Sequence, residues 1–523
     1  MTHDLSRKKS RWLSCLLFAV WLVIGKQVGM NPTCFAKDDR PNVLFLAVDD
    51  MNDWIGCLGG YGGVVHTPNI DRLAESGMLF NNAHCVSPKC APSRAALLTG
   101  LRPSTTGLYD NGHWWLPNLE KAHSLPLHFR NNGYQVVGAG KIFHHTAGNH
   151  PPNQWDRFQR IEFREDPWFR GNRLNYPWSR HSTFPGKFPF SGVNGLGHEN
   201  DWGSLDIPDS DYDDELTVRF TIDFLERMAI SRKKGKHEKP FFLACGLFRP
   251  HLPWYVPQRF FNQYPLEKIL LPQVQGDDLE DLPTTGLQLA ADRRSDFDRI
   301  RNQGSWKNAI QAYLASISCA DDRLGRVLKA LRQSGLERET LVVLWSDHGW
   351  HLGEKQHWHK STLWEESTRV PLVIRLPDAK PGTCRRPVSL LDLFPTLVSL
   401  CRLQNPPQKL DGHSLKNLVL DPNSSWAFPA LTEFRKGNAA VRDQRFRYIR
   451  YQNGGEELYD HLKDPHEFDN LADDPAYRKK RKELSRWIPE KWAPPAAGKK
   501  AFHFDPGEFT WVHRKSGRVV RGK

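Results

Sequence analysis

Apolar segments of strand length alternate with helical segments along most of the chain. Apolar segments of this length occur at 42–48, 134–140, 240–246, 340–346 and 370–376. Segments with the apolar spacing of helices lie between them, at 67–77, 215–228 and 311–331. Continuous apolar strands joined by helices are typical of parallel sheets that are buried on both faces. We therefore expect an α/β fold with a large, mostly parallel sheet sandwiched by helices.

The pattern changes after residue 401. Residues 446–460 predict a hairpin around Asn453-Gly454, and a basic helix is expected near 475–491. We expect an N-terminal domain over 37–401 and a smaller C-terminal α+β domain over 402–495. The remaining residues, 496–523, form a basic, aromatic tail without a clear period.

The first 36 residues differ from the rest of the chain. "RKKSR" precedes 14 uncharged residues, "WLSCLLFAVWLVIG", which matches the charged and apolar regions of a signal peptide. A membrane span needs about 20 apolar residues, so this segment is short for one. Cys34 and Ala36 suit a cleavage site. We expect a signal peptide over 1–36 and an exported protein, periplasmic or extracellular, without stable membrane insertion; a retained N-terminal anchor is the alternative.

The formal net charge of the chain is +13. The basic residues are spread along the sequence rather than gathered in blocks, so no nucleic-acid partner is expected. A basic surface favours the approach of an anionic substrate, and it also serves solubility alone.

Polar residues directly follow four of the predicted strands. They are Asp49 and Asp50, Lys141 and His144, Arg249 and His251, and Asp347 and His348. The carboxyl ends of parallel strands share one edge of a sheet, where ligands bind. Three carboxylates suit Ca²⁺ or Mg²⁺, and His348 is a softer ligand that would also suit Zn²⁺ or Mn²⁺.

"CAPSR" at 90–94 places a cysteine directly before a helix-like segment, "AALLTG". Backbone N–H groups and the dipole at a helix start favour an anion, and Arg94 can point the same way. A thiol in such surroundings is reactive.

Seven cysteines follow the leader, an odd number that leaves at least one thiol unpaired or modified. The chain has no CxxC pair, so a zinc ribbon is not expected.

Several of these strings together resemble one family. "CAPSRAALLTG", "NVLFLAVDDMND", "GKIFHH" and "SDHGWHLGEK" look like type I sulfatases of the alkaline-phosphatase superfamily. In that family the cysteine of C-x-P-S-R is oxidised to formylglycine, which implies a formylglycine-generating maturation enzyme as a partner. The Asp-His of "SDHGW" and its spacing to Lys360 resemble the iduronate-2-sulfatase branch. The resemblance implies an alkaline-phosphatase/sulfatase-like fold with its catalytic domain in 37–401.

The resemblance also implies a metal site. Its ligands would be Asp49, Asp50, Asp347, His348 and the modified Cys90. Many sulfatases have Asn where His348 stands, and the iduronate branch is understood to use Ca²⁺ with this His. One Ca²⁺ per chain is therefore expected.

Catalytic and substrate roles are carried over in the same way. Arg94 would stabilise the formylglycine hydrate, and Lys141 and Lys360 would neutralise sulfate oxygens. His144 would assist formylglycine, and His251 would protonate the leaving oxygen. Trp350 would lie beside the substrate sugar.

These residues predict a secreted sulfatase that acts on a sulfated carbohydrate. The alternatives are a formylglycine-dependent phosphodiesterase or phosphonate monoester hydrolase, and a catalytically dead carbohydrate-binding relative. The insertion at 150–210 mixes basic and aromatic residues that suit an anionic sugar, or that form a lid. They are Arg164, Arg170, Arg173, Arg180, Trp168, Tyr176 and Trp178.

Overall fold

The computed structural model describes residues 39–160, 189–196, 200–204, 208–235 and 239–523. The expected signal peptide lies outside these residues, as do the arginines and aromatic residues of the insertion between 164 and 180. None of the helices in the described ranges combines the length and the apolar character that crossing a bilayer requires.

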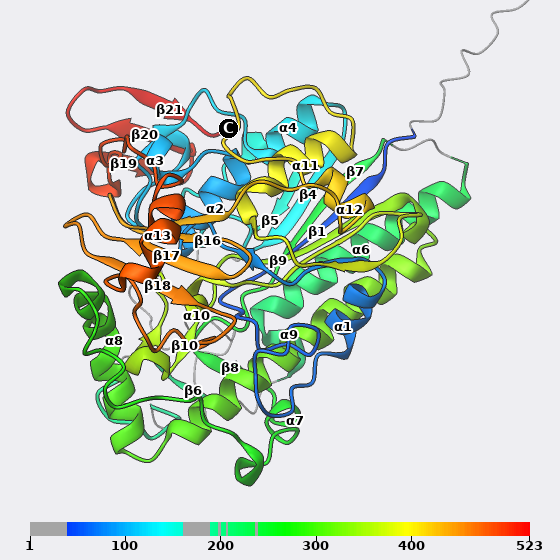
Figure 1. Ribbon diagram of the computed structural model, residues 1–523. Helices are drawn as coiled ribbons and strands as arrows, with labels where there is room; N and C mark the ends of the chain where they lie inside the picture. The colour runs from blue at the N-terminus through cyan, green and yellow to red at the C-terminus, as the bar shows by residue number, and fades with distance from the viewer. Residues whose placement is uncertain (1–38, 161–188, 197–199, 205–207, 236–238) are drawn as a thin grey trace, which may run out of the picture. The chain divides into compact units, whose positions relative to one another are not determined.

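An eight-stranded sheet contains all five strands that the sequence predicts (Figure 1). Its order is β13 (Gly382–Cys384), β2 (Met78–Phe80), β12 (Leu372–Arg375), β9 (Thr340–Ser346), β1 (Asn42–Val48), β7 (Phe241–Gly246), β4 (Gln135–Gly140) and β5 (Arg157–Gln159). β1 pairs in parallel with both β7 and β9, which confirms the mostly parallel sheet. β12 runs antiparallel to both of its neighbours, a reversal that an apolar segment does not reveal.

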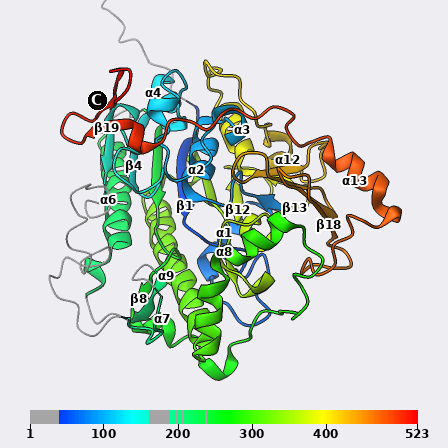
Figure 2. The ribbon, with the colours of Figure 1, turned by 90° about the vertical axis from the view of Figure 1, so that its left-hand side faces the viewer.

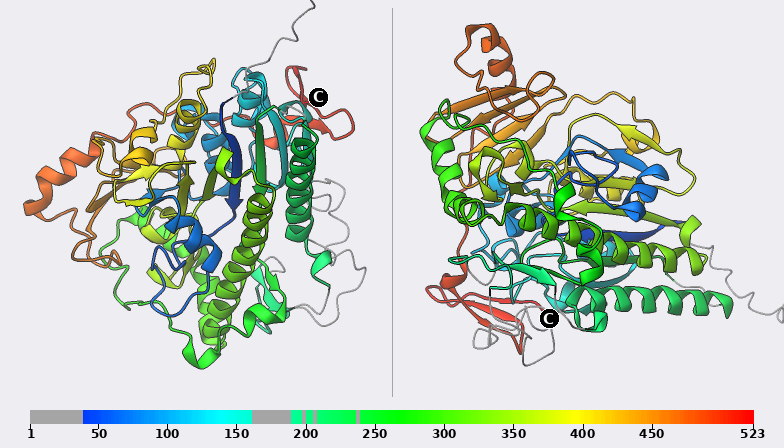
Figure 3. Two further views of the ribbon diagram at one scale, coloured as in Figure 1. Left: turned by 90° about the vertical axis from the view of Figure 1, so that its right-hand side faces the viewer. Right: turned by 90° about the horizontal axis from the view of Figure 1, so that it is seen from below.

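Helices cover both faces of this sheet. Leu44 and Leu46 of β1 pack with one set of helices, and the intervening Phe45 and Ala47 pack with the other. The first set is α1 (Pro68–Glu75), α6 (Asp213–Lys233) and α9 (Trp306–Gln333); the second is α2 (Cys90–Thr99), α4 (Leu125–Asn131) and α11 (Leu393–Leu400). Figure 3 shows the teal-green α6 and the yellow-green α9 side by side. Burial on both faces explains why the strands are apolar throughout rather than alternating.

A second, antiparallel sheet follows the main one in the chain. Its strands are β15 (Ala430–Glu433), β16 (Ala439–Arg442), β17 (Phe446–Arg450) and β18 (Glu456–Asp460). The hairpin β17–β18 confirms the one predicted at 446–460. Helix α13 (Arg478–Ser485) ends earlier than expected, because Pro489 disfavours helical backbone at the residue before it. Residues Arg40–Lys523 form one compact unit, and the division at residue 401 stays a prediction.

The tail has more structure than its sequence pattern indicates. Strands β19 (Phe502–Asp505), β20 (Thr510–His513) and β21 (Val519–Arg521) form a three-stranded antiparallel sheet. Trp511 of β20 is fully buried. The N–H of Asn153 donates to the carbonyl of Gly522 at 2.8 Å, and Figure 2 shows the red segment with β19 beside the C-terminus at the upper left. The strands are short and aromatic, so they carry too few residues for a clear period.

Candidate active site

The polar residues after the predicted strands meet at one edge of the main sheet. β9, β1, β7 and β4 are consecutive in the sheet and parallel to one another. Val48 lies opposite Ser346, which brings Asp49 and Asp347 level at the carboxyl ends of β1 and β9. Because all four strands end at this edge, most of the polar residues that follow them gather there, as the sequence predicts. Arg249 does not join them, and its guanidinium donates to the backbone carbonyl of Tyr255 at 3.2 and 3.3 Å.

Cys90 lies at the centre of this group, at the first residue of α2. Its Sγ is 3.2 Å from Nε2 of His348, 3.2 Å from Nζ of Lys360 and 3.7 Å from Nζ of Lys141. Burial raises the pKa of the thiol, and the charges of Lys141 and Lys360 oppose this rise. The unmodified thiol is therefore a poor nucleophile in this position.

Arg94, one turn further along α2, binds carboxylates. Its Nε donates to Asp347 at 2.8 Å and its Nη2 to Asp49 at 2.9 Å, and the side chain is fully buried. Its Nη1 donates to the backbone carbonyl of Lys141 at 2.5 Å. The guanidinium thus fixes both acids and the end of β4. Its expected contact with residue 90 stays a prediction.

Four donor atoms are placed closely enough to hold one cation. The ligand atoms of Asp50, Cys90, Asp347 and His348 all lie within 4.8 Å of one another. Nδ1 of His348 donates to the carbonyl of Gly349 at 3.1 Å, which leaves Nε2 as the nitrogen that faces Asp50. Burial lowers the pKa of His348, so the ring is neutral and Nε2 has its lone pair free for a metal. Carboxylates with a neutral imidazole fit a divalent cation.

Asp50 has the most perturbed surroundings of these ligands. Burial raises its pKa to about 7, against the opposing charges of Lys360 and His348. Its backbone φ is 60°, in the left-handed region, where a non-glycine residue is strained. Such strain and such a pKa are typical of functional positions, where a bound cation would restore the ionised carboxylate.

Two lysines connect the acids to the thiol. Lys360 donates to both carboxylate oxygens of Asp50, at 2.6 and 2.8 Å, and Lys141 donates to Asp49. Nζ of Lys360 lies 5.3 Å from the ring centre of Trp350. Trp350 is 1% exposed, so it packs behind Lys360, and its expected contact with a sugar stays a prediction.

His251 reaches the same edge from the loop after β7. Its Nδ1 donates to the carbonyl of Leu252 at 2.5 Å, and its Nε2 is 3.6 Å from Asp50. Burial lowers the pKa of His251 well below 6.5, and the charges of Lys360 and Lys141 lower it further. The ring is partly exposed, which suits a group that exchanges protons with a substrate.

Sequence reasoning missed two side chains that hold the edge in place. The hydroxyl of Tyr313 donates to the backbone carbonyl of Asp50 at 2.8 Å, and Ser93 donates to the carbonyl of Asp347 at 2.7 Å. Ser93 belongs to the "CAPSR" string, which could have revealed it. Tyr313 lies within the long helix α9 and resembles a core residue, so the sequence carries no signal for it.

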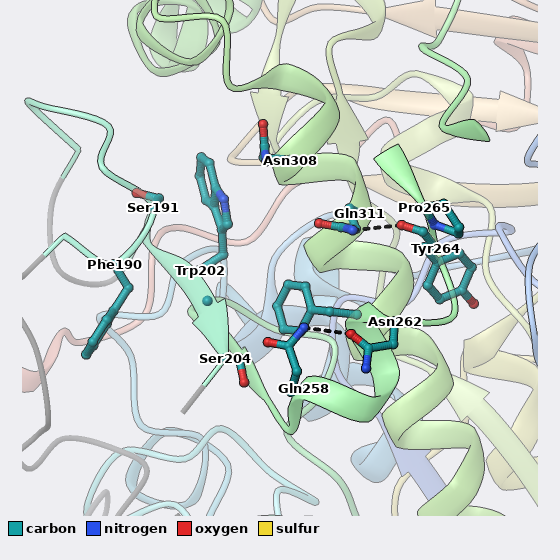
Figure 4. Close-up of a pocket in the computed structure, with 12 residues that line it drawn as sticks. Phe190, Ser191, Trp202, Ser204, Gln258, Asn262, Tyr264, Pro265, Asn308 and Gln311 are labelled. Carbon is teal, nitrogen blue, oxygen red and sulfur yellow. Dashed lines mark hydrogen bonds between the residues drawn. The ribbon is translucent and has the colours of Figure 1, made fainter. Parts of the chain in front are cut away.

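A separate cavity of about 540 Å³ shares no residue with this edge. Among the residues that the structure describes, no acidic or basic side chain lines it, and Figure 4 shows one hydrogen bond between two of its amide groups and one from an amide group to the backbone. Gln258 donates to Asn262 at 2.8 Å, and Gln311 donates to the carbonyl of Tyr264 at 2.7 Å. The chemistry of an anionic ester therefore belongs to the edge around Cys90 and not to this cavity.

Comparison with known proteins places the chain in a family. Residues 41–402 match the family described as Sulfatase, and residues 353–492 match the C-terminal region of N-sulphoglucosamine sulphohydrolase. A sulfatase of Formosa agariphila is 38% identical over 463 residues, covering 86% of this chain and 87% of that protein. Iduronate 2-sulfatase of Homo sapiens is 32% identical over 446 residues, covering 76% and 74%.

Among solved structures, the phosphonate monoester hydrolase of Agrobacterium radiobacter has a TM-score of 0.68. It is 23% identical and covers 86% of this chain and 94% of its own, a likeness that bears on the fold alone. The chain belongs to the sulfatase family, and it is an enzyme that hydrolyses sulfate esters. The predicted family and α/β fold are confirmed.

Proposed function

We propose that this protein is an exported sulfatase that removes sulfate from a sulfated carbohydrate, through a formylglycine made from Cys90 and a bound Ca²⁺. The observation that supports this most is the position of Cys90. Its Sγ lies within 3.7 Å of two lysine ammonium groups and 3.2 Å from a neutral histidine. Cationic side chains around a buried point suit the oxygens of a sulfate ester.

The chain's own residues would prepare the site for the reaction. Lys141 and Lys360 neutralise sulfate oxygens as point charges, and Arg94 keeps Asp49 and Asp347 in place. Asp49, Asp50, Asp347 and His348 would hold the metal, which supplies Lewis-acid polarisation when bound. The hydrate of formylglycine supplies a hydroxyl nucleophile, which replaces the poorly ionised thiol.

His251 would act on the leaving group. An alkoxide leaves poorly, so the sugar oxygen needs a proton as its bond to sulfur breaks. The Nε2 atom faces the edge because Nδ1 is bound to the carbonyl of Leu252. Nδ1 already carries a proton, so Nε2 carries one only in the imidazolium form; in that form His251 is the general acid of this proposal and returns to the neutral ring as the leaving oxygen takes the proton.

Maturation would precede folding. Every residue of α2, including the whole "CAPSR" string, is buried in the folded chain. A maturation enzyme that recognises this string would act before the helix packs. In protein made with such an enzyme, the tryptic peptide that carries Cys90 should be about 18 Da lighter than the thiol form. A peptide that keeps the thiol in fully active protein would contradict the proposal.

The substrate class rests on the relatives and on charge. One similar protein is named iduronate 2-sulfatase, and the net charge of +13 favours an anionic sugar. The test measures sulfate release from a 2-O-sulfated uronic acid at a non-reducing end, beside neutral sulfated sugars. We expect a higher kcat/KM on the uronic acid. Equal values would remove the iduronate-like assignment and leave the sulfatase in place.

A phosphonate monoester hydrolase is the second candidate, supported by the likeness in fold to such an enzyme. A phosphonate or phosphodiester also presents an anionic tetrahedral centre to the same cations. Turnover of a bis-aryl phosphate, measured beside sulfate release, separates the two. A kcat/KM that is higher for the bis-aryl phosphate would favour the second candidate.

A further inference from the structure

Thr146 connects His144 of the candidate site to the tail of the chain. Its Oγ1 lies 3.0 Å from Nδ1 of His144. Two more groups reach the same oxygen: Nζ of Lys499 at 2.7 Å and Nδ2 of Asn149 at 2.8 Å. His144 thus has a polar neighbour whose hydrogen bonds determine which ring nitrogen carries the proton.

The donors and acceptors around Thr146 allow one arrangement. A hydroxyl accepts two hydrogen bonds and donates one, whereas an ammonium group and an amide nitrogen only donate. The orientation of Asn149 is set because its Nδ2 also donates to the backbone carbonyl of Thr146 at 2.8 Å. Lys499 and Asn149 therefore occupy both lone pairs of the hydroxyl. Its hydrogen is donated to Nδ1 of His144, which must accept it.

We propose that Lys499, Asn149 and Thr146 are positioning residues that hold His144 in the tautomer with its proton on Nε2. His144 then presents a hydrogen-bond donor, and not an acceptor, to the anion bound beside residue 90. This rests on the proposed function, in which His144 assists residue 90. His144 lines a small cavity together with Ala91 and Pro92, the residues that follow Cys90.

The surroundings of His144 keep its ring neutral. Burial lowers the pKa of His144 well below 6.5, and the charge of Lys499 is the next largest cause. A neutral imidazole has one donor and one acceptor, so the hydrogen bond at Nδ1 decides the role of Nε2. Without these hydrogen bonds the ring could present a lone pair, which would repel a sulfate oxygen.

Lys499 belongs to the tail and is held by residues 112–114, with its Nζ 5.8 Å from the ring centre of Trp114. Its N–H donates to the carbonyl of Gly112 at 2.7 Å, and the ring of Trp114 packs against Trp511 of β20. Trp114 also donates from Nε1 to the carbonyl of Ala147 at 2.7 Å, which ties the loop of Thr146 to the same tail. Lys499 lies beyond residue 492, where the family matches end. The tail therefore supplies a group to the site that the family matches do not cover.

The first test reads the tautomer directly. The ¹⁵N shifts of His144 in the full-length protein at pH 7 should show Nδ1 as an unprotonated acceptor and Nε2 as protonated. Thr146→Ser keeps the hydroxyl and should keep this pattern. Thr146→Val keeps the shape, removes the hydroxyl and should mix the two tautomers. A proton on Nδ1 in the unaltered protein, or a Thr146→Val spectrum identical to it, would overturn the proposal.

The second test uses two adjacent lysines. Lys499→Met should lower kcat for sulfate release on the order of tenfold, as loss of an outer positioning group typically does, and Thr146→Val should do the same. Lys500→Met removes an exposed charge next to it and should leave kcat unchanged. Equal losses in both lysine variants would show a charge effect and reject positioning. If no sulfate ester is hydrolysed at all, the proposed function fails, whereas the tautomer result still decides this inference.

Discussion

Two buried clusters in this protein contain the same kinds of side chains. The residue-90 cluster consists of Asp49, Asp50, Cys90, Asp347 and His348, with Arg94, Lys141 and Lys360 around it. The residue-447 cluster consists of Glu365, Glu467, His461 and Arg447. Both bring carboxylates and an imidazole within 4.8 Å of one another, the spacing a metal would need. They differ in the group that fills the centre.

A guanidinium fills the centre of the residue-447 cluster. Nε of Arg447 donates to Glu467 at 2.5 Å, and its Nη2 donates to Glu365. His461 is 2.9 Å from the same oxygen of Glu467. A planar guanidinium with fixed donors satisfies carboxylates without a metal. This cluster therefore joins α10 (Glu365–Thr368) to the antiparallel sheet and is structural.

A thiol fills the centre of the residue-90 cluster. It makes one long contact with the carboxylates, from Sγ to Asp50 at 3.9 Å, and their charges are neutralised from the outside by Arg94, Lys141 and Lys360. The centre is thus left to a small, chemically modifiable group. Ligand spacing alone therefore does not distinguish a reactive site from a structural one, whereas the group at the centre does.

The largest effect is expected at the central thiol. Cys90→Ala should lower kcat for sulfate release by about 10⁵-fold or more, because it removes the nucleophile's precursor. The free energy of unfolding should change by only about 1 kcal/mol. Steady-state kinetics and urea unfolding measure the two effects. Full activity in Cys90→Ala would remove the distinction between the clusters.

The opposite pattern is expected at the central guanidinium. Arg447→Met leaves Glu467 buried without its guanidinium partner and leaves Glu365 with Arg442 as its remaining guanidinium partner, so unfolding should become about 3–5 kcal/mol easier. The kcat of the folded variant should stay unchanged. Arg450→Met, on the same strand and half-buried, is the control and should cost less than about 1 kcal/mol. A loss of kcat without a loss of stability would contradict the structural assignment.

The next largest effect is expected when His251, the proposed general acid, is replaced. His251→Gln should lower kcat about 10²- to 10³-fold on an alkyl sulfate, and much less on 4-nitrophenyl sulfate, whose leaving group needs no proton. Because the pKa of His251 lies well below 6.5, its protonated fraction falls as pH rises through that pKa. The kcat/KM for the alkyl sulfate should fall likewise, and this limb should be absent in the variant. An equal loss on both substrates would exclude the acid role.

Removal of the metal should lower the stability of the protein through the residue-90 cluster and not through the residue-447 cluster. A ligand present at about 100 times its Kd stabilises the folded state by about 2.7 kcal/mol, so a chelator should lower both Tm and turnover. Ca²⁺ should restore both Tm and turnover. Zn²⁺ is tested beside it because His348 would also suit Zn²⁺ as a ligand. The Arg447→Met variant should lose as much Tm and turnover on chelation as the unaltered protein does. Chelated protein with unchanged Tm and turnover would refute the metal site.

The smallest effect is an acid dependence at the residue-447 cluster. Burial raises the pKa of Glu365, but the charges of Arg442, His461 and Arg447 outweigh burial and hold this pKa well below 4.5. The pKa of Glu467 is also lowered. A lowered carboxyl pKa stabilises the folded state above 4.5, and this contribution is lost as pH falls through the folded pKa. The free energy of unfolding, measured in urea below pH 4.5, should therefore fall less steeply with acid in Arg447→Met, and an identical slope would contradict the prediction.

Five of the eight strands of the main sheet, and most of the residues of the candidate site, are recognisable in the sequence alone. Strand-length apolar segments are recognisable because both faces of β1 are buried. The acids and histidines after these segments meet because parallel strands end at one edge, so their position in the chain also gives their position in space. "CAPSR" carries its own chemical signature at the start of α2.

The partners that these side chains take follow from the fold and not from the local sequence. Arg94 bonds to Asp49 and Asp347, residues 45 and 253 positions away, and no local pattern encodes such pairing. Lys499 reaches Thr146 across 353 positions, and it does so because the aromatic residues of the tail pack around Trp114. Hydrogen bonds between distant segments depend on side-chain directions that packing sets. The sequence therefore names the chemical groups of the site, and the fold decides which of them hold one another in place.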